Sequence, residues 1–283
     1  INPPVRLTFY PFAQGVVSDF DNNSEADVTA GLDLKYGISD SFTLDLTLVP
    51  DFGQTAFDEV RLNLGPFEQT FEENRAFFTE GVELFDKGEI FFSRRIGGPP
   101  SGTIEDLNPN EFIIEAPSNV NILNAVKVSG RTKKGLGVGF LNSITERTYA
   151  TIRDSVTGST QKRLIEPITN YNVFVVDQVF NGNSSVSFIN TNVLRDGSDY
   201  RDANVTAGVF SIADKENRFR TSGRAIVSNV NEGDGYKSGF QSEFDVFRTK
   251  GNLRYRVGHD FANTTLDIND LGVNFRNNYN NFV

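Results

Sequence analysis

Alternation of apolar and polar residues with a period of two is the feature that most constrains the fold of this chain. Apolar residues share one parity within residues 236–246 and again within residues 253–261: Tyr236, Phe240, Phe244 and Val246, then Leu253, Tyr255, Val257 and Phe261. Such a pattern is typical of a β-strand with one apolar face. We therefore expect two adjacent strands in this part of the chain.

These two stretches also predict a register. A two-residue turn at Lys250-Gly251 would join them as a hairpin. The apolar partners would then be Phe244 with Val257, Val246 with Tyr255, and Phe240 with Phe261. On the other face Asp245 would meet Arg256. The apolar and the charged residues both agree with this pairing. A slip of one residue would move every side chain to the opposite face.

Further strands follow from the same pattern elsewhere. A hairpin with one apolar face is predicted from residues 28–36 and 42–48,. Weaker alternation indicates strands at residues 136–144, 172–180, 186–195, 204–212, 219–227 and 271–275. The links between them are rich in Asn, Asp and Gly, which suit tight turns. We predict an all-β antiparallel meander with one short helical turn, at residues 69–75.

Composition indicates how such a meander could meet a membrane. The chain holds 26 Phe and 8 Tyr at a mean hydropathy of -0.33, so its apolar residues are dispersed. No run approaches the ~20 apolar residues of a membrane helix, whereas strands of about ten residues match a tilted membrane strand. We predict that the meander forms a transmembrane β-barrel, or an incomplete portion of one. A soluble β-sandwich also alternates and is the alternative.

The barrel hypothesis assigns individual side chains to the two sides of the wall. Seven apolar residues would face lipid: Tyr36, Leu44, Phe240, Phe244, Tyr255, Val257 and Phe261. Four charged residues would face the lumen: Asp33, Asp245, Arg254 and Arg256.

Residue usage argues against several functions. The chain has 27 Lys plus Arg and 37 Asp plus Glu, a formal charge of -10, which does not suit a nucleic-acid backbone,. It has no Cys, which excludes a disulfide framework and a thiolate metal site,. The single histidine, His259, lies on an apolar strand face, where a structural role is the more common one. We expect no cofactor and no nucleic-acid partner.

One short run resembles the start of a calcium loop. Asp19, Asp21, Asn23 and Glu25 alternate, but Ser24 stands where an EF-hand needs Gly, and no Glu closes the loop,. We therefore expect a solvated turn between two strands, at which calcium could bind adventitiously.

A dense mixture of Phe, carboxylate and Arg between Leu48 and Gly97 is not explained by any periodicity. Its distinctive residues are Pro50, Asp51 and Phe52, then Glu73, Arg75, Phe77 and Phe78, then Glu80 and Gly81, then Ser93, Arg94, Arg95, Ile96 and Gly97. This pattern resembles the barrel domain, of unknown function, that Bacteroidota carry behind a family-9-like carbohydrate-binding module. The family usually has Pro where this chain has Glu72 and Ala76, so the local turn can differ.

The resemblance implies a cellular location and an architecture rather than a chemical reaction. It implies that residues 1–283 form a domain of a bacterial outer-membrane β-barrel, with residues 49–97 as a lumenal or barrel-capping segment. The implied partners are outer-membrane lipid and lipopolysaccharide, with other envelope proteins or glycans. It also implies further strands beyond this sequence, and since the chain starts at Ile1 and holds no Met, we expect it to be part of a longer polypeptide.

The charged residues of this region have two interpretations. Glu73, Arg75, Glu80, Arg94 and Arg95 could form one lumen-facing network of charge-assisted pairs that holds the region in place,. Alternatively, carboxylates of residues 68–83, such as Glu73 and Glu80, could serve as acid and base in a surface glycan hydrolase. We favour the structural network and a non-catalytic role in passage, ligand capture or anchoring at the cell surface.

Overall fold

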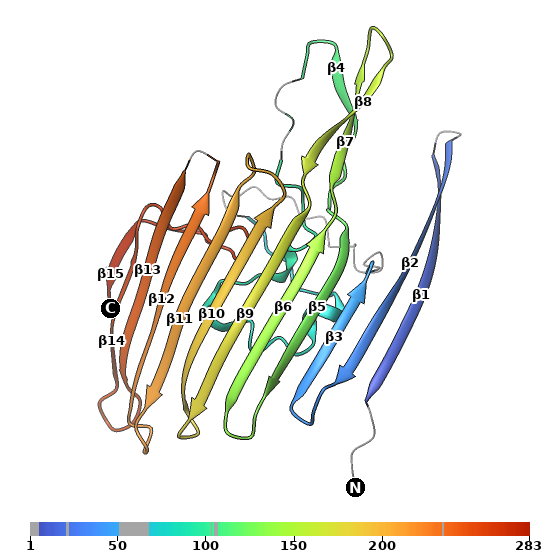
Figure 1. The fold of residues 1–283 in the computed structure, drawn as a ribbon. Helices are drawn as coiled ribbons and strands as arrows, with labels where there is room; N and C mark the ends of the chain where they lie inside the picture. Colours follow the sequence, from blue (N-terminus) through green and yellow to red (C-terminus); the bar gives the residue numbers. More distant parts are fainter. Residues whose placement is uncertain (1–5, 21–22, 51–67, 103, 105–106, 234) are drawn as a thin grey trace.

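A computed structural model describes residues 6–20, 23–50, 68–102, 104, 107–233 and 235–283. Twelve antiparallel strands form one sheet in the order β1-β2-β3-β5-β6-β9-β10-β11-β12-β13-β14-β15 (Figure 1). Their bounds are β1 Leu7–Phe20, β2 Asn23–Gly37, β3 Phe42–Leu48, β5 Ile122–Arg131, β6 Leu136–Thr145, β9 Thr169–Phe180, β10 Ser184–Arg195, β11 Asp202–Ala213, β12 Phe219–Asn231, β13 Tyr236–Arg248, β14 Tyr255–Ala262 and β15 Tyr279–Phe282. The predicted all-β antiparallel meander is confirmed.

Three further strands form a small separate sheet, in the order β4-β7-β8. They are β4 Glu111–Glu115, β7 Thr148–Asp154 and β8 Thr160–Glu166. The hairpin of β7 and β8 links β6 to β9 and extends past one end of the large sheet (Figure 1, top). Among the described residues, β1 and β15 end the large sheet and do not pair with each other, so the sheet is open.

The β13–β14 hairpin has the predicted faces but a different register. Phe244 lies opposite His259 and Val246 opposite Val257, a shift of two residues. The predicted two-residue turn is wrong because pairing stops at Arg248 and Tyr255, which leaves a longer connection. A slip of two keeps each side chain on its face, and Arg256 still donates to Asp245 across the strands, with an Nε to Oδ1 distance of 2.6 Å.

Two smaller predictions are wrong. Residues 69–75 are not helical; the helical turn α1 begins afterwards, at Ala76–Thr79. Residues 271–275 are not a strand, because Leu271 belongs to the β14–β15 connection, where it is buried by packing rather than by strand pairing. None of the helices in the described part of the chain is long and apolar enough to cross a membrane.

The core lies on one face of the large sheet, which we call the inner face. Residues 68–98, the inner segment, lie against it and carry α1 and two single 3-10 turns, η2 Lys87–Glu89 and η3 Ser93–Arg95 (Figure 1, cyan and teal). The core joins side chains of this segment to side chains of the strands: Phe78, Leu84, Phe85, Ile90 and Ile96 with Leu141, Tyr171, Val173, Val175, Ile189, Val193, Val205, Ala207 and Ile226. Irregular chain rather than a second sheet therefore covers the inner face, unlike in a β-sandwich.

Strand parity separates the inner face from the opposite, outer face. On β9 and β10, Val175 and Ile189 are fully buried, whereas Phe174 and Phe188 are 41% and 46% exposed. The seven apolar residues predicted to share one side of the wall lie on the outer face. Asp33, Asp245 and Arg256 lie on the opposite parity, as predicted. Arg254 differs, because it precedes β14 and is exposed in the turn.

Candidate functional site

The candidate site is the contact between the inner segment and the inner face, because this contact fills the space that the sheet partly encloses. Phe85 and Ile90 are fully buried against the strands. Gly88 packs so closely on Ala207 that a Cβ atom at Gly88 would lie 2.9 Å from the Cβ of Ala207. The inner segment therefore packs closely on the large sheet, and its polar contacts decide how firmly it is held.

Arg75 ties the start of the inner segment to its end. Its Nε and Nη2 donate to the two carboxylate oxygens of Glu73 at 2.8 and 2.7 Å. Its Nη1 and Nη2 also donate to the carbonyl oxygens of Ile96 and Ser93 at 2.6 and 2.8 Å. The guanidinium group lies 4.3 Å from the centre of the Phe78 ring. Burial opposes ionisation of Glu73, but Arg75 and the Ser93 hydroxyl hold its pKa below the usual range.

Lys127 of β5 anchors the same segment to the sheet. Its side chain is fully buried, and its Nζ donates to the carbonyl oxygens of Phe77 and Glu80. Asp45 of β3 lies 3.6 Å from the same nitrogen. The sequence analysis missed Lys127. The alternation of apolar Val126 and Val128 with polar Lys127 and Ser129 was a usable signal for a strand with Lys127 on its polar side. A buried ammonium group is tolerated when such partners surround it.

The structure distributes the five predicted charged residues among several partners. Glu73 pairs with Arg75, whereas Glu80 pairs with Lys35 of β2 and lies at the surface. Arg94 donates to the carbonyl oxygen of Glu72. Arg95 donates to both carboxylate oxygens of Glu68, at 2.8 and 2.6 Å, and to the carbonyl oxygen of Gly272 at 3.1 Å.

The remaining motif residues shape the turns of the segment. Gly81 and Gly97 have φ values of 62° and 72°, which other residues rarely adopt,. Phe77 and Phe78 form an edge-to-face pair with ring centres 5.0 Å apart, and Ile96 is fully buried. The Ser93 hydroxyl donates to Glu73 at 2.6 Å. Pro50 is partly buried, and Asp51 and Phe52 lie outside the described residues.

The tip of the inner segment, Lys87–Glu89, contacts the large sheet between β9 and β12. Lys87 lies 3.8 Å from Asp177 of β9, a fully buried carboxylate that also accepts a hydrogen bond from Ser187 at 2.6 Å. Glu89 pairs with Arg224 of β12 at 2.5 Å. The tip is thus pinned by one charged pair on each side.

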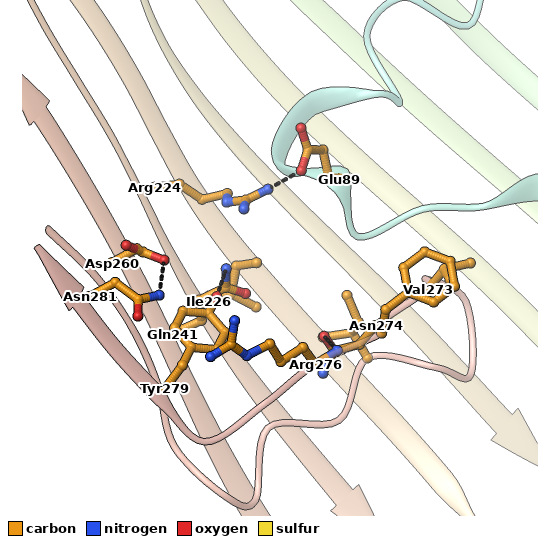
Figure 2. Close-up of a pocket in the computed structure, with 12 residues that line it drawn as sticks. Glu89, Arg224, Ile226, Gln241, Asp260, Val273, Asn274, Arg276, Tyr279 and Asn281 are labelled. Carbon is orange, nitrogen blue, oxygen red and sulfur yellow. Dashed lines mark hydrogen bonds and ion pairs between the residues drawn. The ribbon is translucent and has the colours of Figure 1, made fainter. Parts of the chain in front are cut away.

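A polar pocket of 370 Å³ lies beside this tip (Figure 2). It is lined by residues of the tip, of β12–β15 and of the β14–β15 connection: Glu89, Arg224, Ile226, Gln241, Asp260, Ile268, Val273, Asn274, Phe275, Arg276, Tyr279 and Asn281. The pocket lies on a part of the inner face that the described residues of the inner segment leave uncovered.

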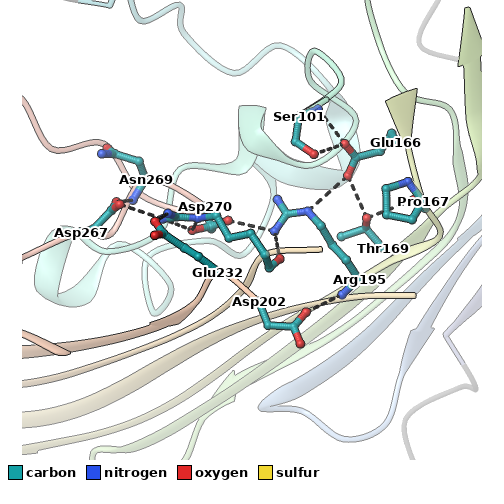
Figure 3. Close-up of polar contacts among 11 residues, drawn as sticks. Ser101, Glu166, Pro167, Thr169, Arg195, Asp202, Glu232, Asp267, Asn269 and Asp270 are labelled. Atoms are coloured by element: carbon teal, nitrogen blue, oxygen red, sulfur yellow. Dashed lines mark hydrogen bonds and ion pairs between the residues drawn. The ribbon is translucent and has the colours of Figure 1, made fainter. Parts of the chain in front are cut away.

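A second charged cluster closes the end of the sheet from which β7 and β8 project (Figure 3). Arg195 lies 3.4 Å from Glu166 and 3.0 Å from Asp270, and all three side chains are buried. Ser101 donates to Glu166 through both its backbone and its hydroxyl, while Arg201 binds Asp270 at 2.7 Å. This cluster fastens the connection before β4 and the β14–β15 connection to the wall. Sequence reasoning missed it, because its members are distant in the chain.

The other sequence-predicted sites are placed as follows. His259 lies on the outer face of β14, 2.8 Å from the Asn280 side chain, with its ring 4.5 Å from that of Phe282. In the run from Asp19 to Glu25, which is expected to form a solvated turn, Asp21 and the side chains around it lie outside the described residues. Among the residues that the structure does describe, no group of three or more His, Cys, Asp or Glu side chains could hold a metal ion.

Comparison with known proteins gives the family. Residues 3–283 match the model of the family described as "Domain of unknown function (DUF5916)", and the chain belongs to that family. No curated protein matches the chain. Similar solved structures include the outer-membrane expressed OmpT of Vibrio cholerae, with 13% identity, coverage of 100% of this chain and 97% of that chain, and a TM-score of 0.29. In-vitro folded OmpT, an outer membrane protein of Vibrio cholerae, has 11% identity, coverage of 98% and 94%, and a TM-score of 0.31.

Proposed function

We propose that this chain forms the wall of a bacterial outer-membrane β-barrel and that its inner segment restricts the passage of solutes through the lumen. The role is physical rather than catalytic: fixed charges and the position of the inner segment decide what crosses. The observation that carries this proposal is the contrast, within the same strands, between an outer face whose central rows carry no charged side chain and an inner face that carries several.

The outer face of β6 and β9–β13 supports contact with lipid. Its apolar members include Leu136, Val138, Phe140, Phe174, Val176, Val186, Phe188, Phe210, Ile212, Val227, Phe240, Phe244 and Val246. In the cross-strand rows of these residues, no described outer-face residue is Asp, Glu, Lys or Arg. Asp202, the first residue of β11, and Arg248, the last of β13, lie on the outer face beyond these rows. From Phe240 to Val246 the band extends six residues, about 20 Å along the strand at ~3.3 Å per residue, close to the ~25 Å apolar band of outer-membrane barrels.

A row of amides borders this band on one side. Asn142, Asn172, Asn192, Asn204 and Asn229 lie side by side in register across β6 and β9–β12, and Ser238 of β13 continues the row. Asn142 donates to Asn172 at 2.9 Å, and the Ser238 hydroxyl donates to Asn229 at 2.7 Å. Polar side chains that bond to one another in this way suit the boundary between hydrocarbon and headgroups.

The connections support a sidedness. At the end of the sheet opposite to β7 and β8, the connections are short: residues 38–41, 132–135, 181–183, 214–218 and 249–254. The other end carries the long connections, including the one that holds the inner segment. Outer-membrane barrels have short periplasmic turns and longer extracellular loops, so the inner segment would enter the lumen from the cell surface.

A membrane barrel also sets a requirement on the two sheet edges. Backbone groups of β1 and β15 that are left unpaired in lipid would each cost several kcal/mol. The proposal therefore requires these edges to be paired in the membrane, with each other or with additional strands.

A surface glycan hydrolase is the weaker candidate. Its carboxylates would need one residue that stays protonated and one that is ionised. Glu73 is enclosed by Arg75 and Ser93, and its pKa is lowered. The hydrogen bond from Lys35 lowers the pKa of Glu80 as well. Neither carboxyl is arranged as a general acid, and both serve as anchors of the inner segment.

Two finer expectations rest on the resemblance of the motif between residues 50 and 97. It implies an origin in Bacteroidota and a carbohydrate-binding module elsewhere in the protein. It also suggests that ligand capture or anchoring at the surface accompanies passage, with lipopolysaccharide, envelope proteins or glycans as partners.

The test is ion conductance of the full-length protein in planar bilayers. Arg75→Gln should loosen the inner segment and raise or destabilise the conductance relative to the unsubstituted protein. Arg153→Gln, which changes an exposed arginine of β7, is the matched control and should leave the conductance unchanged. Insertion without any effect of Arg75→Gln would contradict the passage role, and failure to insert would contradict the barrel itself.

A further inference from the structure

The pocket beside the tip of the inner segment is an open cavity next to the contacts that anchor the segment. Its 370 Å³ lie within the range of about 300 to 1,000 Å³ that is typical of small-molecule sites,. Most of its lining is polar (Figure 2). Among its apolar members, Ile226 and Ile268 are buried, whereas Val273 and Phe275 are accessible. A ligand here would meet polar groups beside a small apolar area.

The polar side chains of the pocket hold one another in place. Gln241 donates from Nε2 to the Tyr279 hydroxyl at 2.9 Å, across β13 and β15. Asn281 donates from Nδ2 to Asp260 at 3.0 Å, across β15 and β14. These contacts use one donor of each amide and leave further donors and acceptors for a ligand. Pre-oriented groups of this kind reduce the entropy lost on binding.

The charges of the pocket are balanced. Two arginines, Arg224 and Arg276, face two carboxylates, Glu89 and Asp260. Arg224 contacts Glu89 at 2.5 Å and also Glu243, which lies outside the lining, at 3.3 Å, while its buried Nε has no hydrogen-bond partner among the described residues. An anionic ligand would meet the two carboxylates and a cationic ligand the two arginines, so neither charge is favoured.

We propose that this pocket binds an uncharged, hydroxyl-rich molecule of about the size of a simple sugar. Each hydroxyl can donate one hydrogen bond and accept two, which matches a lining with both donors and acceptors. The C–H groups of such a molecule would lie against Val273 and Phe275, the accessible apolar members of the lining. The site would therefore select neutral polyols at a part of the inner face that residues 68–98 leave uncovered.

Three probes with related skeletons separate the charge classes: glucose, gluconate and glucosamine. Binding is measured by saturation-transfer NMR and equilibrium dialysis on the full-length protein in detergent micelles. Glucose should bind in preference to both charged analogues. Preferential binding of gluconate or glucosamine, or no binding of any probe, would overturn the proposal.

Adjacent asparagines on opposite faces of β15 provide a matched pair of variants. Asn281→Leu removes a pocket amide and should weaken glucose binding about tenfold, in line with the loss of a hydrogen bond and its oriented partner. Asn280→Leu changes the outer face next to His259 and should leave binding unchanged. Equal weakening by both variants would overturn the site. Because the assay needs no bilayer, its failure is distinguishable from failure of the membrane proposal.

Discussion

The two faces of the large sheet are both rich in apolar residues, yet they differ in where charge lies. On the inner face, buried Val173, Val175 and Ile189 are interspersed with charged Asp177 and Arg224. The outer face of β6, β9 and β10 alternates Phe, Val and Asn, and the exposed Phe140, Phe174 and Phe188 have no charged neighbours among the described residues of their rows. A water-soluble sheet usually shows the reverse, with its charges on the exposed face.

The side of the sheet on which charged residues lie, more than the side on which apolar residues lie, therefore identifies the surroundings of each face. Hydrophobic alternation located the strands, but apolar residues on the inner face weaken the pattern. Charged side chains can be kept on the inner face because the inner segment supplies their partners, as for Lys127. The predictions below test each half of the contrast.

The largest effect is expected from Lys127→Ala. The substitution leaves Asp45 and two carbonyl oxygens without their buried cation. Breaking a buried pair from one side typically costs about 3 to 5 kcal/mol. We expect release of the inner segment, seen as rapid cleavage within residues 68–98 by added protease while the strands stay protected. Lys162→Ala, at an exposed position of β8, is the control. Unchanged cleavage kinetics would show that Lys127 is not an anchor.

A charge on the outer face should have the next largest effect. Val186→Arg places a cation within the uncharged band, which costs about 2 to 4 kcal/mol near the middle of a bilayer. We expect a lower yield of bilayer-inserted protein and a lower urea midpoint. Val156→Arg, in the exposed β7–β8 turn, should be neutral. If both variants insert equally well, the outer face does not contact lipid.

Acid should loosen the inner segment. Because the pKa of Glu73 is lower in the folded protein than its ordinary value of 4.5, its ionised form stabilises the fold. This contribution is present above that ordinary value and is lost as the pH falls through the folded pKa. We expect protease sensitivity of the segment to rise below about pH 4, with little change between pH 5 and 8. A rise centred near neutral pH would point to a different group.

The smallest effect is expected from Arg95→Ala. Arg95 pairs with Glu68, whose side chain is 48% exposed. Exposed pairs contribute about 0 to 1 kcal/mol, so cleavage should accelerate far less than in Lys127→Ala, and the barrel should still assemble. An effect as large as that of Lys127→Ala would mean that Arg95 carries a structural role beyond its visible contacts.

Sequence predicted the strands with regular alternation, and it predicted their faces even where the register was wrong. The β13–β14 register failed because turn length, not side-chain preference, fixed the pairing at Arg248 and Tyr255. Within the candidate site, Arg75 and Glu73 could be paired from proximity in the chain. Lys127, Arg195 and Arg224 could not, because their partners are brought together only when distant segments pack.

The most direct test of the central claim measures what surrounds the outer face. Since the chain contains no Cys, single cysteines can be introduced at Phe174 and Phe188, with Val156 as the exposed reference, and labelled with a nitroxide in bilayers. The account predicts high accessibility to oxygen and low accessibility to a water-soluble nickel chelate at the two band positions, and the opposite at Val156. High accessibility to the nickel chelate at Phe174 and Phe188 would contradict it.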